Sequence, residues 1–124
     1  MRITRGFTLI ELLVVLAIVA TLLSIITPRF LSQADKAKEA ALKENLTTLR
    51  VSIDRYYADN GQYPEKLFQL VEKRYLRQLP LDPITNHRDS WKLDTIDEEG
   101  KTVIYDVNSG AAGTGLDGSR YDSW

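Results

Sequence analysis

The stretch RGFTLIELLVVLAIVATLLSIITPRF (residues 5–30) contains a run of apolar side chains that extends from Phe7 to Thr27. An α-helix rises about 1.5 Å per residue, so about 20 such residues span the hydrocarbon layer of a bilayer. Arg2 and Arg5 precede the run. The positive-inside rule therefore places the N-terminus in the cytoplasm and the rest of the chain on the other side of the membrane. Residues 7–28 are predicted to form a transmembrane helix.

Glu11 places a carboxylate near the start of this apolar run. A charge near the middle of a membrane helix costs on the order of 2.5–3.5 kcal/mol, and such residues usually have a partner and a function. A cleaved secretory signal peptide is the main alternative. The run is long for the apolar region of such a peptide, and no A-x-A cleavage site follows it. The sequence therefore favours a retained segment in which Glu11 meets a partner.

The hexapeptide GFTLIE (residues 6–11), after a short basic leader and before a long apolar run, resembles the N-terminus of type IV pilins and type II secretion pseudopilins. The resemblance implies that a prepilin peptidase cuts after Gly6, removing residues 1–6, and that Phe7 becomes the N-methylated new N-terminus. It also implies that Glu11 of one subunit neutralises the Phe7 amine of a neighbour and sets the register of the filament. Two charges that are costly in an apolar environment become tolerable as a pair. In a lone subunit, Glu11 can instead lie at the level of the lipid headgroups.

A second helical segment follows the apolar run. Pro28 removes one helical hydrogen bond and is predicted to break or kink the helix. Residues 30–58 then continue as a helix, and Gly61 is expected to end it in the left-handed conformation. Apolar side chains recur in this segment at spacings of three or four, namely Leu42, Leu46, Leu49, Ile53, Tyr56 and Tyr57. Since no linker separates the two helical segments, residues 29–124 are expected to form a domain built directly on the membrane helix.

A run of charged side chains lies mainly off this apolar stripe: Asp35, Lys36, Lys38, Glu39, Lys43 and Glu44. Glu39 and Lys43 are one helical turn apart and can pair with each other. Two interpretations of the run remain open, a face exposed to solvent and a set of salt bridges between filament subunits.

The remaining residues predict a small domain of mixed secondary structure. A short helix is expected over residues 64–76, with Pro64 in its first turn. The sequence LPLDP (residues 79–83) cannot continue a helix and predicts an ordered turn.

Residues 90–95 and 101–107 predict two antiparallel strands joined by a turn around Gly100. We expect this sheet to pack on the apolar stripe of the long helix, which makes the fold class α+β. The candidate core residues of the strands are Trp91, Leu93, Val103 and Tyr105.

Composition excludes several kinds of site. The chain has 16 Lys and Arg against 17 Asp and Glu, so no basic surface for nucleic acid is predicted. It has no cysteine, which excludes a disulfide framework and a thiolate metal site. His87 is the single histidine and lies in a polar stretch, where a surface role is expected. No combination of a nucleophile and a base is visible, and the chain is not predicted to be an enzyme.

The C-terminal half resembles the major, G-type pseudopilins in three motifs, DNGQYP (residues 59–64), YLRQLPLDP (residues 75–83) and YDVNSGAAGTGLDG (residues 105–118), and in the final Trp124. The resemblance implies the type IV pilin fold, with a long helix packed on a small antiparallel sheet. Adhesive pilins of the disulfide-bearing kind close their last loop with two cysteines, which this chain lacks.

The resemblance also implies a calcium site, because G-type members bind calcium in their C-terminal loop through acidic side chains and carbonyl oxygens. Calcium takes about six to eight oxygen ligands. Asp117, Asp122 and Ser109 are the side chains that this loop offers. The paired aspartates that are usual near the end of that loop are missing, however. The alternative is a glycine-rich loop ordered by turns and hydrogen bonds.

The function that the resemblance implies is that of the major structural subunit of a type II secretion pseudopilus, a filament that helps drive proteins across the outer membrane. The expected partners are copies of the chain, minor pseudopilins, a prepilin peptidase with N-methyltransferase activity, an inner-membrane platform protein and an assembly ATPase. The subunit is expected to cross the inner membrane once, with its C-terminal domain in the periplasm. Two alternatives remain: a type IV pilin of a surface filament for adhesion, motility or DNA uptake, and a monomeric membrane-anchored binding module.

Overall fold

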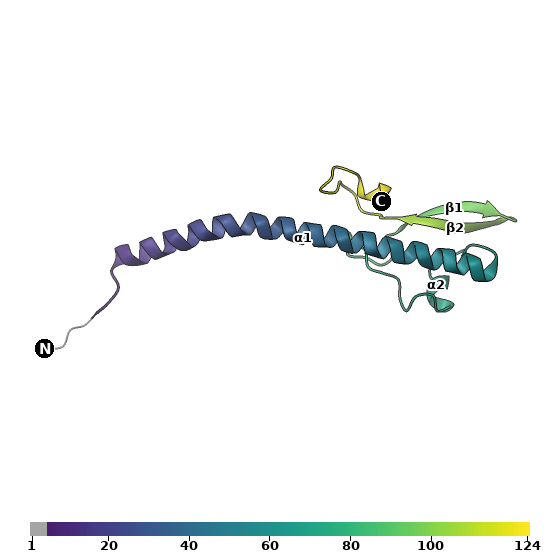
Figure 1. The fold of residues 1–124 in the computed structure, drawn as a ribbon, viewed down its shortest axis with the longest axis horizontal. Helices are drawn as coiled ribbons and strands as arrows, with labels where there is room; N and C mark the ends of the chain where they lie inside the picture. Colours follow the sequence, from purple (N-terminus) through teal and green to yellow (C-terminus); the bar gives the residue numbers. More distant parts are fainter. Residues whose placement is uncertain (1–4) are drawn as a thin grey trace. The chain divides into compact units, whose positions relative to one another are not determined.

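The computed structural model describes residues 5–124, which divide into a unit ending at Asp35 and a second unit, Lys36–Trp124. Helix α1 (Leu9–Asn60) contributes to both units. The second unit also contains α2 (Gln69–Glu72), β1 (Lys92–Glu98), β2 (Lys101–Asn108) and the short 3₁₀ helix η1 (Tyr121–Ser123) (Figure 1). This arrangement confirms the predicted α+β fold of a long helix with a small antiparallel sheet. Residues 1–4 of the predicted leader lie outside the described residues.

The first unit consists mainly of the apolar part of α1. Its side chains from Leu9 to Leu31 are exposed throughout, and an 18-residue window of α1 reaches a mean hydropathy of 2.9. By length and composition, this helix can cross a membrane.

The predicted helix break at Pro28 is absent from the structure, because α1 continues without interruption from Leu9 to Asn60. A proline removes only its own N–H donor and disturbs one turn, so residues on either side can sustain the helix. The expectation that the helix loses regularity here in an assembled filament stays a prediction.

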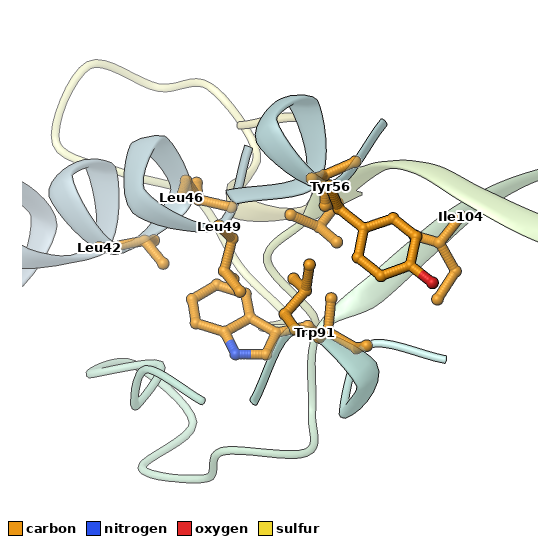
Figure 2. Close-up of a cluster of buried hydrophobic side chains, with 10 residues drawn as sticks. Leu42, Leu46, Leu49, Tyr56, Trp91 and Ile104 are labelled. Atoms are coloured by element: carbon orange, nitrogen blue, oxygen red, sulfur yellow. The ribbon is translucent and has the colours of Figure 1, made fainter. Parts of the chain in front are cut away.

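The core of the second unit is built on one stripe of α1. Leu42, Leu46, Leu49 and Ile53 are almost completely buried, as their spacing predicts. Figure 2 shows this stripe with the Trp91 indole and Ile104 among the side chains gathered against it. Burying each such side chain contributes about 1.5–3 kcal/mol, so this stripe is a main source of stability for the unit.

Strands β1 and β2 form an antiparallel hairpin that confirms the predicted pair of strands. The turn consists of Glu99 and Gly100, which both have positive φ angles, of 52° and 80°. Two such residues in succession match the right-handed twist of the strands they join. The turn is shorter than expected, so β1 extends to Glu98.

The predicted facing of the strands is partly wrong. Trp91 and Val103 are buried as expected, but Leu93 and Tyr105 are 42% and 43% exposed. The register shifts between Asp94 and Thr95, which pair with Asp106 and Ile104 and so leave Tyr105 as an extra residue in β2. Such a bulge reverses the alternation of faces. Ile104 and Val107 therefore occupy the core positions.

The predicted helix over residues 64–76 is wrong in extent, because only the four residues of α2 are helical. The chain reverses directly after α2: Arg74 has a φ angle of 64°, Tyr75 N donates to Leu70 O at 2.8 Å, and Arg74 N donates to Val71 O at 3.1 Å. This is the hydrogen-bond pattern of a Schellman motif, which ends a helix. By contrast, the expected left-handed Gly61 after α1 is confirmed, with a φ angle of 71°.

Candidate functional site

The predicted processing site lies just before α1 in backbone that is neither helix nor strand. Residues 5–8 have no regular structure, and the Phe7 side chain is 92% exposed. A side chain added at Gly6 would meet nothing within 4 Å. Exposed, irregular backbone of this kind is the preferred substrate of proteases. The Gly6–Phe7 bond is therefore accessible in the chain.

Glu11 has a partner within its own chain. Its backbone N–H donates to Thr8 Oγ1 at 3.2 Å, while its carboxylate Oε2 accepts from the backbone N–H of Thr8 at 3.2 Å. Thr8 precedes the first helical residue and Glu11 is the third, which is the spacing of a capping box. The two residues thus satisfy two N–H groups that the first turn of a helix otherwise leaves unpaired. Sequence spacing alone contained this signal, since T-x-x-E precedes the apolar run.

A hollow of 460 Å³ opens beside this cap, lined by Arg5, Gly6, Phe7 and Glu11. The cleavage position and the carboxylate thus border the same space. After cleavage, the new amine of Phe7 would lie near the N-terminus of α1, which is the positive end of the helix dipole. The first turn of α1 already carries the Glu11 carboxylate.

Polar side chains within the apolar segment are bonded to their own helix. The hydroxyls of Thr21, Ser24 and Thr27 each donate to the carbonyl four residues earlier at 2.8 Å. Such bonds hide a hydroxyl from lipid. Among the described residues of the apolar run, Glu11 is therefore the side chain that carries a formal charge.

The three side chains predicted to hold calcium are engaged elsewhere. Ser109 is fully buried and its hydroxyl donates to Asp82 Oδ2 at 2.7 Å. Asp122 receives two hydrogen bonds from the Arg120 guanidinium, at 3.1 and 2.6 Å.

Asp117 Oδ1 accepts from both the amide and the hydroxyl of Ser119, at 2.9 and 2.6 Å. These bonds, the one from the hydroxyl first, hold the pKa of the Asp117 carboxyl below its ordinary value. The Oδ1 atom of Asp117 is thus engaged within its own turn.

These residues do not fit a calcium ion as they are arranged. Within residues 5–124 no group of three or more Asp, Glu or His side chains is placed to hold a metal. No buried polar side-chain atom in that range lacks a hydrogen-bond partner, so no orphaned oxygen marks a cation position. Ser109 is buried against Asp82 and Asp122 is paired with Arg120, so calcium binding through the three predicted residues would require this arrangement to change.

Sequence reasoning missed Asp82, which lies within the predicted LPLDP turn. Its side chain is completely buried, and its carboxylate accepts from Ile84 N at 2.9 Å, Thr85 N at 3.3 Å and the Ser109 hydroxyl. It thus shapes its own turn and ties that turn to the end of β2. The Asp-Pro pair indicated a turn, but no local pattern indicated the contact with Ser109, which is 27 residues away. His87 lies exposed in the same turn, where its backbone carbonyl accepts from Asp82 N.

Comparison with known protein families finds the prokaryotic N-terminal methylation motif in residues 1–27. No solved structure matches the chain.

Curated relatives cover more of the chain. It is 34% identical to the type II secretion system core protein G of Pseudomonas aeruginosa, over 65% of this chain and 68% of that protein. The protein of the same name from Escherichia coli is 32% identical over 66% of this chain and 68% of its own length. The one from Aeromonas hydrophila is 30% identical over 88% of this chain and 86% of its own length. The chain has a methylation motif at its start and an exposed apolar helix, and it matches these relatives over two thirds or more of their length. It therefore belongs to the family of type II secretion system core protein G, the major pseudopilins.

Proposed function

We propose that this chain is the major structural subunit of a type II secretion pseudopilus and that it acts by assembling into a filament. Its relatives carry the name of that system's core protein G. The observation that carries the proposal is the first unit itself: an exposed apolar helix whose first turn holds a carboxylate beside a cleavable Gly6–Phe7 bond.

Cleavage by a prepilin peptidase and methylation of Phe7 prepare the subunit. The new terminal amine stays cationic after methylation, and Glu11 of a neighbouring copy supplies the opposite charge. A carboxylate offers about four acceptor positions, so Glu11 can keep its bond to Thr8 N and accept a neighbour's ammonium at the same time. The capping box would then hold Glu11 in place before the neighbour arrives.

Assembly exchanges lipid contacts of the apolar segment for contacts between helices. The subunit waits in the inner membrane with its N-terminus in the cytoplasm and the second unit in the periplasm. A platform protein and an assembly ATPase add it to the filament, and minor pseudopilins complete the structure. In this mechanism the chain is a structural component and carries out no catalysis.

Two substitutions of Glu11 test the proposal in cells that assemble the filament. Glu11→Gln retains a side chain that caps a helix at this position but loses the charge, whereas Glu11→Ala loses both. We expect both variants to insert and to be cleaved, because neither adds a charge to the apolar run, and both to form few or no filaments. Electron microscopy counts the filaments, and mass spectrometry of the membrane fraction reports cleavage and methylation.

Ser24→Ala is the matched control, since it removes a polar group from the same segment that is bonded only to its own helix. This variant should assemble normally. Abundant filaments from Glu11→Gln would show that the charge of Glu11 is dispensable and would overturn its role in register.

A surface pilus for adhesion, motility or DNA uptake is the second candidate from the sequence. The relatives reported above all carry the name of the secretion system, so nothing in the comparisons favours this alternative. A monomeric binding module would leave the exposed apolar helix without a role beyond anchoring.

A further inference from the structure

One carboxylate of α1 accepts hydrogen bonds from two points of the C-terminal loop, residues 109–124. Glu39 Oε1 accepts a hydrogen bond from Leu116 N at 2.7 Å and another from the Tyr121 hydroxyl at 3.0 Å. A single oxygen thus joins two points of the loop. Hydrogen bonds to an ionised acceptor are stronger than those between neutral groups, so Glu39 is a firm anchor.

Arg50, further along α1, holds the two ends of the same loop. Its Nη2 donates to Val107 O and to Trp124 O, both at 2.9 Å, and its Nε bonds to Asp106 Oδ1 at 2.9 Å. The planar guanidinium presents its donors in a fixed fork, which suits several acceptors at once. Arg50 therefore connects the end of β2 with the last residue of the chain.

Lys43 lies between these two anchors and contacts the ring of Trp124. Its Nζ atom is 4.6 Å from the ring centroid, within the range of a cation–π interaction. The same indole lies edge-on to Tyr121, with centroids 5.1 Å apart, and donates from Nε1 to Ser119 Oγ at 2.6 Å. Trp124 thus closes the loop over the helix.

Glu39, Lys43 and Arg50 lie on one face of α1. Their spacings of four and seven residues each differ by less than half a residue from a whole number of helical turns. The sequence suggested that Glu39 and Lys43 pair with each other. In the structure both are directed to the C-terminal loop instead. Within the single chain, Glu39 and Lys43 thus contact the C-terminal loop rather than each other, and the two interpretations of the charged run stay open.

A hollow of 520 Å³ between α1 and the loop is lined by Lys43 and Arg50 on the helix and by Asp117 on the loop. A divalent cation placed in this hollow would meet the positive charges of Lys43 and Arg50, which repel it. Asp122, the other candidate ligand, is already neutralised by Arg120. Basic side chains thus lie in the hollow and beside Asp122.

We propose that Glu39, Lys43 and Arg50 of α1 close the C-terminal loop and that its order is independent of any divalent cation. The proposal concerns the single chain, and it holds or fails separately from the proposed role in a filament.

The test is amide hydrogen exchange of residues 111–124 in the full, processed chain in detergent micelles, followed by mass spectrometry. Wild-type protein is measured with excess chelator and again with excess calcium. We expect the same protection in both. Glu39→Ala should raise the exchange rate of the loop by about tenfold, as the loss of a hydrogen bond to a charged acceptor predicts.

Glu44→Ala is the matched control, because Glu44 is an exposed acid on the same helix and its backbone carbonyl, rather than its carboxylate, accepts the bond from Thr48. It should leave loop exchange unchanged. Glu39→Gln retains an acceptor oxygen and should restore most of the protection.

Two results would overturn the proposal. One is a loop that exchanges much faster in chelator than in calcium. The other is a Glu39→Ala variant whose loop exchanges like that of Glu44→Ala. Should Glu39→Ala fail to fold, Tyr121→Phe decides in its place, because it removes the hydroxyl bond to Glu39 and keeps the ring beside Trp124. Faster loop exchange in Tyr121→Phe, unaffected by calcium, is the expected result, and an unchanged rate would contradict the proposal.

Discussion

Three carboxylates that accept hydrogen bonds from the backbone shape this chain at the level of single residues. Glu11 accepts from Thr8 N, Glu39 from Leu116 N, and Asp82 from two amides of its own turn. In each case the acid fixes the position of a backbone donor, and for the buried Asp82 the loss of the acceptor is costly as well. These acids are structural residues, although the charged positions around them are mostly exposed.

Asp82→Ala is expected to destabilise the second unit by at least about 2 kcal/mol, since it leaves the Ser109 hydroxyl and two amides without their acceptor. Chemical unfolding of the full chain in micelles, followed by the fluorescence of the buried Trp91, measures the loss. Asp89→Ala removes an exposed acid of the same region and should change the free energy of unfolding by less than about 0.5 kcal/mol. Equal stability of the two variants would show that Asp82 does not tie its turn to Ser109.

At the scale of elements, α1 carries two different surfaces along one continuous helix. Its first part exposes apolar side chains all round, whereas its second part buries a single stripe and turns Glu39, Lys43 and Arg50 toward the C-terminal loop. The hairpin and that loop complete the second surface, with the loop beginning close to the backbone before β1. The element that anchors the subunit is thus also the template for its domain.

Gly110 sits where the end of β2 passes the segment before β1. A Cβ atom added there would collide with the carbonyl oxygen of Ser90, which is backbone and cannot move aside as a flexible side chain can. We therefore expect Gly110→Ala to destabilise the second unit by about 3 kcal/mol, as overpacking does. Gly113→Ala meets no atom within 4 Å but has a φ angle of 100°, and it should cost only about 1–2 kcal/mol. Unfolding curves that place Gly113→Ala below Gly110→Ala in stability would contradict this packing.

At the scale of the whole molecule, the two units differ in what they require from their surroundings. Among the described residues of the second unit, each buried side-chain polar atom has a hydrogen-bond partner, and the apolar stripe of α1 is covered. The first unit leaves its apolar side chains exposed, which is stable only in lipid or against other chains. A chain of this kind is suited to move from a membrane into a filament.

Gly6→Val tests this view of the molecule. Since a side chain at Gly6 has open space around it, the substitution should leave the fold intact and act on processing alone. We expect the leader to stay attached, no amine to form at Phe7, and both filaments and secretion to be lost. Mass spectrometry of the purified chain, electron microscopy and an assay of secreted protein give the three readouts. Normal secretion by an uncleaved chain would show that the protein does not act through assembly.

Local sequence patterns predicted most of the elements. The apolar run, the stripe from Leu42 to Ile53, the left-handed Gly61 and the turn at Gly100 each follow from neighbouring residues, and the structure confirms them. The errors arose where a chain reversal or the pairing of two strands, rather than the spacing of apolar residues, decides the outcome. The helix expected over residues 64–76 is reduced to one turn by the reversal at Arg74, and the bulge at Tyr105 turns Ile104 inward.

By itself, the sequence determined that one helix is apolar enough for a membrane, that residues 1–27 carry an N-terminal methylation motif, and that a small α+β domain follows. These features depend on hydropathy and on spacings of a few residues, which are properties of the chain alone. The tertiary structure decided how the C-terminal loop is held. Glu39 meets Tyr121 across 82 residues and Arg50 meets Trp124 across 74, so only folding brings these helix side chains to the C-terminal loop.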